Sequence, residues 1–261
     1  MSDEPRQKVQ RESGAGITND RELGARFPEF GPSLSDLAER YGLDGVAVRR
    51  LRLFGSLLVH DPLAPTTVRA PMQVRDDHLA DALVGLGLPE LRGATTLADL
   101  GAGAGVPGIP LAIALPGARV TLLEGNNRKC AFMARAIELL GLGNANVVHG
   151  RAETWREGLG SCCVVTARAV APLDVLAEYA APLLTVGGAL VAWRGQREPE
   201  AEADAARAAA ILGLDVRDPI RVQPYDGAEH RYLHVLTKVA QTPDRFPRRD
   251  GVARKRPLGR A

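Results

Sequence analysis

The chain has 261 residues, of which 45% are hydrophobic and 25% charged, and its net charge at pH 7 is +2. These proportions are those of a soluble globular protein. The three cysteines form no C-x-x-C pair, which argues against a disulfide framework or a zinc site and fits a reducing cytosol. The uncharged run over residues 100–118 is long enough for a membrane helix, but its five glycines and three prolines exclude one.

The first third of the chain divides into two parts. Residues 1–31 carry mixed charges, Gly and Pro with no sustained period, so we predict a mobile extension without a secretory signal, and a cytoplasmic protein. Residues 32–92 contain three stretches of helical spacing, at 34–41, 46–59 and 76–86. These stretches predict an N-terminal helical cap.

A glycine-rich turn then follows a short apolar strand predicted over residues 95–100. Gly101, Gly103 and Gly105 stand at alternate positions, where side chains would otherwise keep a ligand away from the backbone. A second predicted strand, over residues 119–124, ends at Glu124, which lies twenty-one residues after Gly103. Glycines followed at this distance by a carboxylate indicate a nucleoside site, where the acid accepts the ribose hydroxyls.

The glycines alone leave the ligand open. Gly103, Gly105 and Gly108 also satisfy the dinucleotide pattern G-x-G-x-x-G, so an NAD-dependent oxidoreductase and a turn without a ligand are alternatives. Asp99, however, stands two residues before the first glycine. A carboxylate there would repel a pyrophosphate but suits an ammonium-bearing ligand such as S-adenosylmethionine.

Strand and helix periods alternate over residues 93–242. We expect seven strands, at residues 95–100, 119–124, 145–149, 162–167, 188–193, 216–222 and 232–239. The last two are joined by about nine residues and must be antiparallel neighbours. The sequence therefore predicts a doubly wound α/β domain with a mostly parallel seven-stranded sheet.

Positive charge is concentrated at the C-terminal end. Residues 243–261 contain seven Lys or Arg against two Asp, so this segment carries +5 and the rest of the chain −3. We predict an exposed basic tail, too polar to pack as core, that contacts RNA phosphates. A solvated tail, or one that Phe246 and Pro247 pin to the domain, is the alternative.

Several motifs together resemble the glucose-inhibited division protein B family of bacterial small-subunit ribosomal RNA guanine-N7 methyltransferases. The resemblance runs from about residue 78 to residue 258. Its motifs are Asp99-Leu-Gly-Ala-Gly-Ala-Gly-Val-Pro-Gly, Leu122-Leu-Glu, Gly150-Arg-Ala-Glu, Ala167-Arg-Ala-Val-Ala-Pro-Leu and the tail Phe246-Pro-Arg-Arg-Asp-Gly-Val-Ala-Arg-Lys-Arg-Pro-Leu. It departs from the family at Arg194-Gly195, where Lys-Gly is usual.

The resemblance implies a Rossmann-like methyltransferase with S-adenosylmethionine as cofactor, no metal and no membrane partner. Together with the glycine pattern it gives the expected cofactor-binding residues Asp99, Gly101, Gly103, Gly105, Val106, Glu124, Asn126, Ala152, Glu153 and Arg168. The residues expected to bind RNA are Arg128, Lys129, Arg194, Arg248, Arg249, Arg254, Lys255 and Arg256. The expected partner of the protein is small-subunit ribosomal RNA or an assembling small subunit. We expect the protein itself to be a monomer. No catalytic acid or base is assigned.

Two further functions agree with the sequence. A methyltransferase of a small molecule would keep the cofactor site and leave the basic tail in solvent. A non-catalytic RNA-binding module would keep the fold without the transfer. Methyl transfer to small-subunit RNA separates these alternatives.

Overall fold

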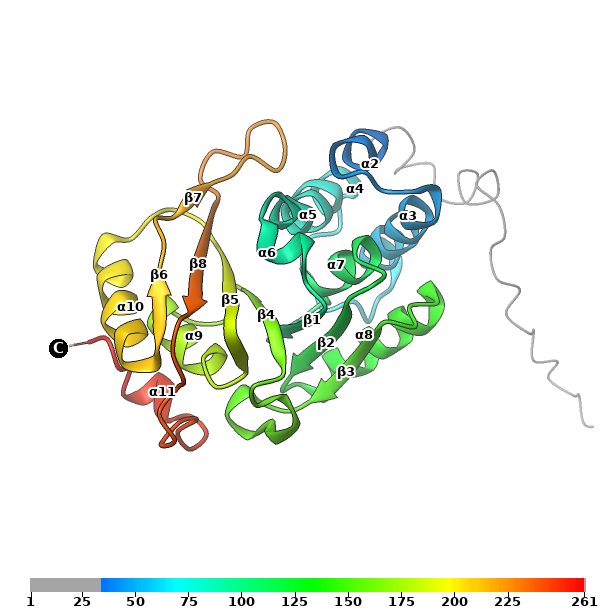
Figure 1. The fold of residues 1–261 in the computed structure, drawn as a ribbon. Helices are drawn as coiled ribbons and strands as arrows, with labels where there is room; N and C mark the ends of the chain where they lie inside the picture. Colours follow the sequence, from blue (N-terminus) through cyan, green and yellow to red (C-terminus); the bar gives the residue numbers. More distant parts are fainter. Residues whose placement is uncertain (1–33, 261) are drawn as a thin grey trace, which may run out of the picture.

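A central sheet of eight strands runs through residues 34–260, the part of the chain that the computed structural model describes (Figure 1). The extension predicted over residues 1–31 lies outside the described residues. The strand order is β3-β2-β1-β4-β5-β8-β6, and β7 pairs with β8 beside β6. The strands are β1 (Thr96–Leu100), β2 (Arg119–Glu124), β3 (Ala145–His149), β4 (Cys162–Arg168), β5 (Leu184–Arg194), β6 (Leu214–Val216), β7 (Ile220–Arg221) and β8 (Tyr232–Lys238).

The prediction of seven strands was wrong by one. The segment expected as a single strand over residues 216–222 forms two short strands, β6 and β7, which both pair antiparallel with β8. Pro219 lies between them and has no N–H to donate to a neighbouring strand, which accounts for the break. The doubly wound, mostly parallel arrangement is confirmed, because β3, β2, β1, β4 and β5 are parallel neighbours.

Helices cover both faces of the sheet. On one face, the helical elements before β1 pack with α7 and α8 against the sheet; on the other face lie α9, α10 and α11 (Figure 1). Consecutive strand residues point to opposite faces, so Leu97 belongs to the first core and Ala98 to the second. The elements before β1 are α2 (Ser35–Tyr41), α3 (Gly45–His60), α4 (Pro71–Val74), the π-helical turn η3 (Arg75–Ala80), α5 (Asp81–Leu83), η4 (Val84–Gly87) and α6 (Pro89–Arg92). Those that follow are α7 (Gly108–Ala114), α8 (Asn127–Leu140), η5 (Ala152–Thr154), η6 (Arg156–Gly158), α9 (Leu173–Ala180), α10 (Pro199–Leu212) and α11 (Val252–Lys255).

Local sequence signals explain where the main helices begin and which face they bury. Asp44 precedes α3, and its side chain accepts a hydrogen bond from Ala47 N at 2.7 Å, which satisfies one of the free N–H groups of the first turn. Leu51, Phe54 and Leu58 of α3 follow the helical period and are 1% exposed or less, so this face joins the core. The predicted helix at 46–59 is thereby confirmed.

The parallel strands bring several chain turns to one edge of the sheet. Leu100 of β1 pairs with Leu123 of β2, and Glu124 pairs with His149 of β3. Because the strands run in the same direction, the turns after β1, β2, β3 and β4 all emerge at their carboxyl ends. In open α/β sheets this edge is where ligands bind.

Candidate cofactor and substrate pockets

The carboxyl ends of β1 to β4 surround a hollow of about 360 Å³, which we call the strand-end pocket. Five of the ten expected cofactor residues line it: Gly101, Glu124, Asn126, Ala152 and Glu153. Wall residues not expected from the sequence include Tyr179 of α9 and Val170 after β4. Val170 belongs to a quoted motif, but Tyr179 carries no signal in the sequence because it reaches the pocket only through the packing of α9.

Glu124 is fixed at the pocket wall by backbone donors. Its Oε2 accepts a hydrogen bond from Gly103 N at 3.1 Å, and its Oε1 accepts one from Asn126 N at 2.8 Å. Each carboxylate oxygen has a second lone pair, so both can accept further hydrogen bonds. The glycine turn and the acid after β2 are therefore one unit, in which the backbone of the turn orients the carboxylate.

Two glycines of the turn meet specific geometric demands. Gly101 has φ +60°, and a Cβ there would approach Val170 Cγ2 to 2.9 Å in the pocket wall. At Gly108 a Cβ would lie 2.1 Å from Leu122 Cδ2, so only glycine lets α7 pack this closely on β2. The glycine pattern thus combines a turn with close packing between helix and strand.

Asp99 lies beneath the turn and does not line the pocket. It is fully buried, and its Oδ2 and Oδ1 accept hydrogen bonds from Gly108 N at 2.9 Å and Thr166 Oγ1 at 2.8 Å. Burial raises its pKa to about 7, although both hydrogen bonds oppose the rise. Gly103, Gly105 and Val106 also lie outside the lining. Direct contact of these four residues with a cofactor stays a prediction, and the structure gives Asp99 a role in holding the turn.

The C-terminal segment packs against the domain, contrary to the expectation that it is too polar to do so. Phe246 and Ala253 are 8% and 1% exposed and belong to the core beside α9 and α10. Arg248 forms a double ion pair with Glu178 of α9, with Nε to Oε1 at 2.5 Å. Glu178 is 2% exposed, so this pair is buried on the carboxylate side. Apolar anchors and two ion pairs to carboxylates that are 2% exposed, Arg248 with Glu178 and Arg260 with Asp174, thus hold this segment on the domain.

This segment also completes the strand-end pocket. Gly251 N donates to Glu153 Oε1 at 3.2 Å, and Arg151 Nη1 pairs with Asp250 Oδ1 at 3.0 Å. Arg254, expected on RNA, instead lines the pocket and donates to Val170 O at 3.0 Å. Loss of residues 246–261 would therefore remove part of the pocket wall.

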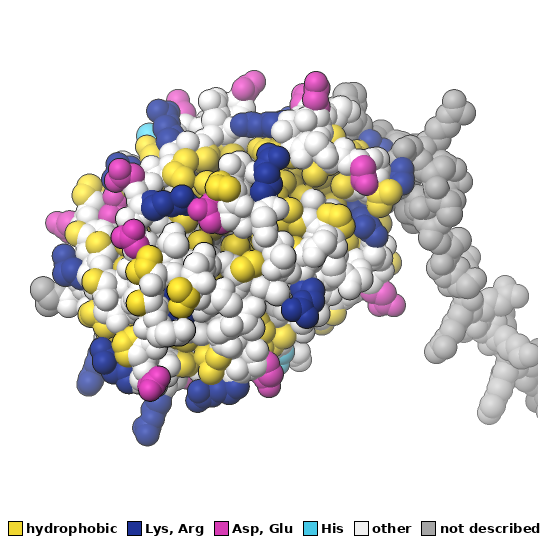
Figure 2. All heavy atoms as spheres, viewed as in Figure 1, with side chains coloured by type: hydrophobic (Ala, Val, Ile, Leu, Met, Phe, Trp, Pro, Cys, Tyr) yellow, Lys and Arg dark blue, Asp and Glu magenta, His cyan; other side chains and the backbone are white. Residues whose placement is uncertain are grey.

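The other residues expected on RNA are spread over three places. Arg249, Lys255 and Arg256 are exposed on the C-terminal segment, where Figure 2 shows Lys and Arg side chains gathered at the lower left of the view. Arg128 and Lys129, in the first turn of α8, line a separate hollow beside Leu63. Arg194 lies at the end of β5 and donates to Ala171 O at 3.2 Å.

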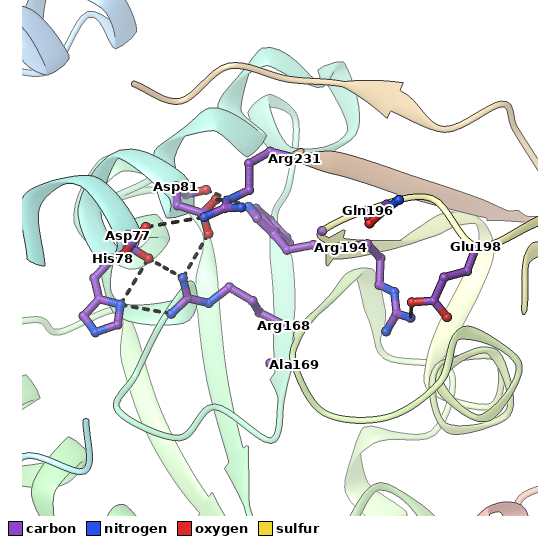
Figure 3. A pocket seen from close by; sticks show the side chains of 11 residues that line it. Asp77, His78, Asp81, Arg168, Ala169, Arg194, Gln196, Glu198 and Arg231 are labelled. Carbon is purple, nitrogen blue, oxygen red and sulfur yellow. Dashed lines mark hydrogen bonds and ion pairs between the residues drawn. The ribbon is translucent and has the colours of Figure 1, made fainter. Parts of the chain in front are cut away.

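A second hollow, of about 530 Å³, lies between the cap and the ends of β4 and β5, and we call it the cap pocket (Figure 3). It is lined by Asp77, His78, Asp81, Arg168, Ala169, Trp193, Arg194, Gly195, Gln196, Glu198 and Arg231. Arg168, expected at the cofactor, lines this hollow and pairs with Asp81 at 2.9 Å. Arg168 is thus held by a carboxylate of the helical elements before β1.

His78 is held neutral in the cap pocket. Its Nε2 lies 2.9 Å from Thr66 Oγ1, and its Nδ1 lies 3.2 Å from Arg168 Nη2 and 3.1 Å from the Asp77 carbonyl oxygen. Burial, followed by the nearby positive charge of Arg168, lowers the pKa of His78 to about 4. The ring is therefore uncharged at neutral pH.

Within residues 34–260, no helix combines the length and apolar character required to cross a bilayer. The same residues bring together no group of three or more His, Cys, Asp or Glu side chains suited to a metal ion.

Comparisons with known proteins agree with the resemblance in the motifs. The family described as rRNA small subunit methyltransferase G (GidB) matches residues 63–218. A protein of that name from Pelotomaculum thermopropionicum is 40% identical over 81% of this chain and 90% of its own length, and one from Rubrobacter xylanophilus is 42% identical over 85% and 83%. A branched-chain polyamine synthase from Thermus thermophilus shares the fold, with a TM-score of 0.54, 14% identity, and coverage of 77% of this chain and 69% of its own. From its motifs, its strand-end pocket and these relatives, the chain is a member of the rRNA small subunit methyltransferase G family.

Proposed function

We propose that this protein transfers a methyl group from S-adenosylmethionine to N7 of a guanine in small-subunit ribosomal RNA. The observation that carries the proposal is the backbone-oriented Glu124 carboxylate at the glycine turn, in a chain whose relatives bear the name of small-subunit ribosomal RNA methyltransferases. We further propose that it acts in the cytoplasm as a monomer.

The strand-end pocket offers hydrogen-bonding groups and a charge that suit the cofactor. Glu124 has free lone pairs for the two ribose hydroxyls, and the backbone at Ala152 and Glu153 can pair with the edge of an adenine. Arg254 brings a guanidinium to the same pocket, which suits the single carboxylate of the ligand. Acceptors for hydroxyls and a donor for a carboxylate are what this cofactor requires.

The chemistry demands positioning more than proton transfer. When bound, S-adenosylmethionine supplies an electrophilic methyl, so the lone pair of guanine N7 forms the new N–C bond while the electron pair of the C–S bond returns to sulfur. N7 carries no proton, and no general base is required. Holding two reactants in line can supply about 7–11 kcal/mol of the barrier. This agrees with a site built from orienting contacts.

The exposed cations supply the contact to the RNA backbone. Arg249, Lys255 and Arg256 stand on the C-terminal segment that walls the strand-end pocket, and Arg128 and Lys129 begin the helix after Glu124. Charges beside the cofactor pocket neutralise phosphates next to the methylated base, and this binding weakens with added salt. Arg194 joins them from the end of β5.

The test is methyl transfer with the purified full-length chain. Tritiated S-adenosylmethionine is incubated with small-subunit RNA, both free and in immature particles, and the labelled nucleotide is identified after digestion. We expect 7-methylguanosine at a single position, and calorimetric binding of S-adenosylmethionine but not of NAD. Label on a small molecule, or no label with intact cofactor binding, would contradict the proposed substrate.

A further inference from the structure

The strand-end pocket and the cap pocket share one wall. Val170 lines the strand-end pocket, and its neighbour Ala169 lines the cap pocket. Ala169 has φ +56°, a left-handed conformation that L-residues rarely adopt, so the chain turns sharply where β4 ends. The two pockets therefore adjoin at the turn after β4.

Asp81 presents an unsatisfied acceptor to the cap pocket. Its Oδ2 accepts a hydrogen bond from Arg168 Nη1 at 2.9 Å, while its Oδ1 has no hydrogen-bond partner among residues 34–260. The residue is only 5% exposed, and Arg231 Nε forms an ion pair with Oδ1 at 3.5 Å without a hydrogen bond. Figure 3 shows Arg168 and Arg231 approaching Asp81 from two sides. Buried carboxylate oxygens normally have a donor, so this oxygen marks a place for one from a ligand.

We propose that the cap pocket receives the target guanine base, which Asp81 recognises through N1–H and the 2-amino group and Arg168 through O6. The assignment rests on the proposed function and names its acceptor site. N7, O6 and N1 follow one another around the rim of guanine, and Ala169, Arg168 and Asp81 follow one another along the pocket wall. A base bound in this order turns its N7 toward the turn at Ala169 and the strand-end pocket behind it.

The charges of the cap pocket favour a base over a phosphate. The lining contains three carboxylates and three guanidinium groups, so hydrogen-bond acceptors and donors are mixed. They belong to Asp77, Asp81 and Glu198 and to Arg168, Arg194 and Arg231. A phosphate would be held by cations alone, whereas guanine presents both donors and acceptors. Adenine has an amino group where Arg168 would donate and no N1–H for Asp81, so the same wall rejects it. Methylation makes the ring cationic, and the Asp81 carboxylate stabilises that charge.

Inosine at the methylated position tests this contact directly, because it keeps N7, O6 and N1–H and lacks only the 2-amino group. A single inosine is introduced into small-subunit RNA by splinted ligation, and kcat/KM is compared with that of the guanine RNA. For the wild-type chain we expect a loss of about ten- to a hundredfold, the value of one hydrogen bond to a charged acceptor. A wild-type chain that methylates both RNAs equally would overturn the assignment.

Asp81→Asn provides the matched variant. We expect it to lose activity on the guanine RNA and to reduce the guanine-to-inosine ratio to about threefold or less, while S-adenosylmethionine affinity stays within about twofold. Glu198→Gln, which alters a carboxylate at the other rim of the pocket, should keep the wild-type ratio. If Asp81→Asn keeps the guanine-to-inosine ratio of the wild type, the assignment of the cap pocket to the guanine base is overturned, while the proposed function stays intact. A wild-type chain that methylates no guanine overturns both.

Gly195→Leu is a second variant in case Asp81→Asn does not fold. Gly195 lines the cap pocket, and a Cβ there would have His230 O at 3.9 Å as its nearest neighbour, so the backbone tolerates a side chain at this position. We expect RNA methylation to fall by at least about tenfold because the base is displaced from the cofactor, with an unchanged melting temperature and S-adenosylmethionine affinity. Full methylation by Gly195→Leu would refute the assignment.

Discussion

The buried ion pair between Arg248 and Glu178 anchors the C-terminal segment, and Arg248→Ala tests that anchor. Glu178 is 2% exposed, so the substitution leaves a carboxylate without its partner inside the domain. Breaking a buried pair from one side costs about 3–5 kcal/mol. At about 2–4 °C per kcal/mol for a domain of this size, the melting temperature should fall by about 6–20 °C.

The same substitution should also weaken cofactor binding. The segment that carries Arg248 also carries Gly251, which donates to Glu153, and Arg254, which lines the strand-end pocket. Loosening them removes one or two hydrogen bonds at the pocket wall, and we expect the S-adenosylmethionine Kd to rise by about two- to tenfold. Thermal melts with and without cofactor, together with calorimetry, measure both effects.

Two controls separate the ion pair from a general effect of removing charge. Arg249→Ala removes an exposed arginine next to the anchor and should leave the melting temperature unchanged. Arg248→Met combined with Glu178→Leu removes both charges and should recover most of the lost stability, because no buried charge is left unpaired. A melting temperature of Arg248→Ala equal to that of Arg249→Ala would refute the anchoring role.

Three further predictions follow from single contacts. Glu124→Ala should raise the Kd for S-adenosylmethionine by about ten- to over a hundredfold in calorimetry, because it removes charge-assisted bonds to the ribose; an unchanged Kd would contradict the assignment. The folded-state pKa of His78, at about 4, lies below its unfolded value of 6.5. The contribution of His78 to the free energy of unfolding is therefore present above pH 6.5 and is lost as the pH falls through 4. Between pH 7 and pH 4, the unfolding free energy of the wild type should therefore fall by on the order of 3 kcal/mol more than that of His78→Gln, as measured by denaturant titration. Parallel pH profiles of the two proteins would show that His78 is not buried in its neutral form. The triple variant Arg249→Ala, Lys255→Ala, Arg256→Ala should flatten the logarithmic salt dependence of RNA binding by about two units, and an unchanged slope would place the RNA contact elsewhere.

Most of the fold could be read from local patterns. The alternation of strand and helix periods predicted the parallel sheet, and the spacing from Gly103 to Glu124 predicted that the glycine turn and the acid meet. These features depend on residues that are near in sequence, because a βαβ unit closes over about thirty residues with a fixed handedness. The break of one predicted strand at Pro219 was also readable in principle, since proline cannot donate to a neighbouring strand.

The strand and helix periods by themselves determined the α/β class, the spacing from Gly103 to Glu124 predicted the nucleoside-binding turn, and the resemblance of the motifs indicated the family. Only the tertiary structure decided that the basic C-terminal segment walls the strand-end pocket and that Arg168 faces the cap. The ion pairs responsible join Arg248 to Glu178, 70 residues apart, and Arg168 to Asp81, 87 residues apart. Periodicity carries no information about such pairs, because a charged side chain has the same local pattern whether it meets solvent or a buried partner. The choice is made by the packing of α9 and the cap against the sheet, which brings a buried carboxylate within reach of each arginine.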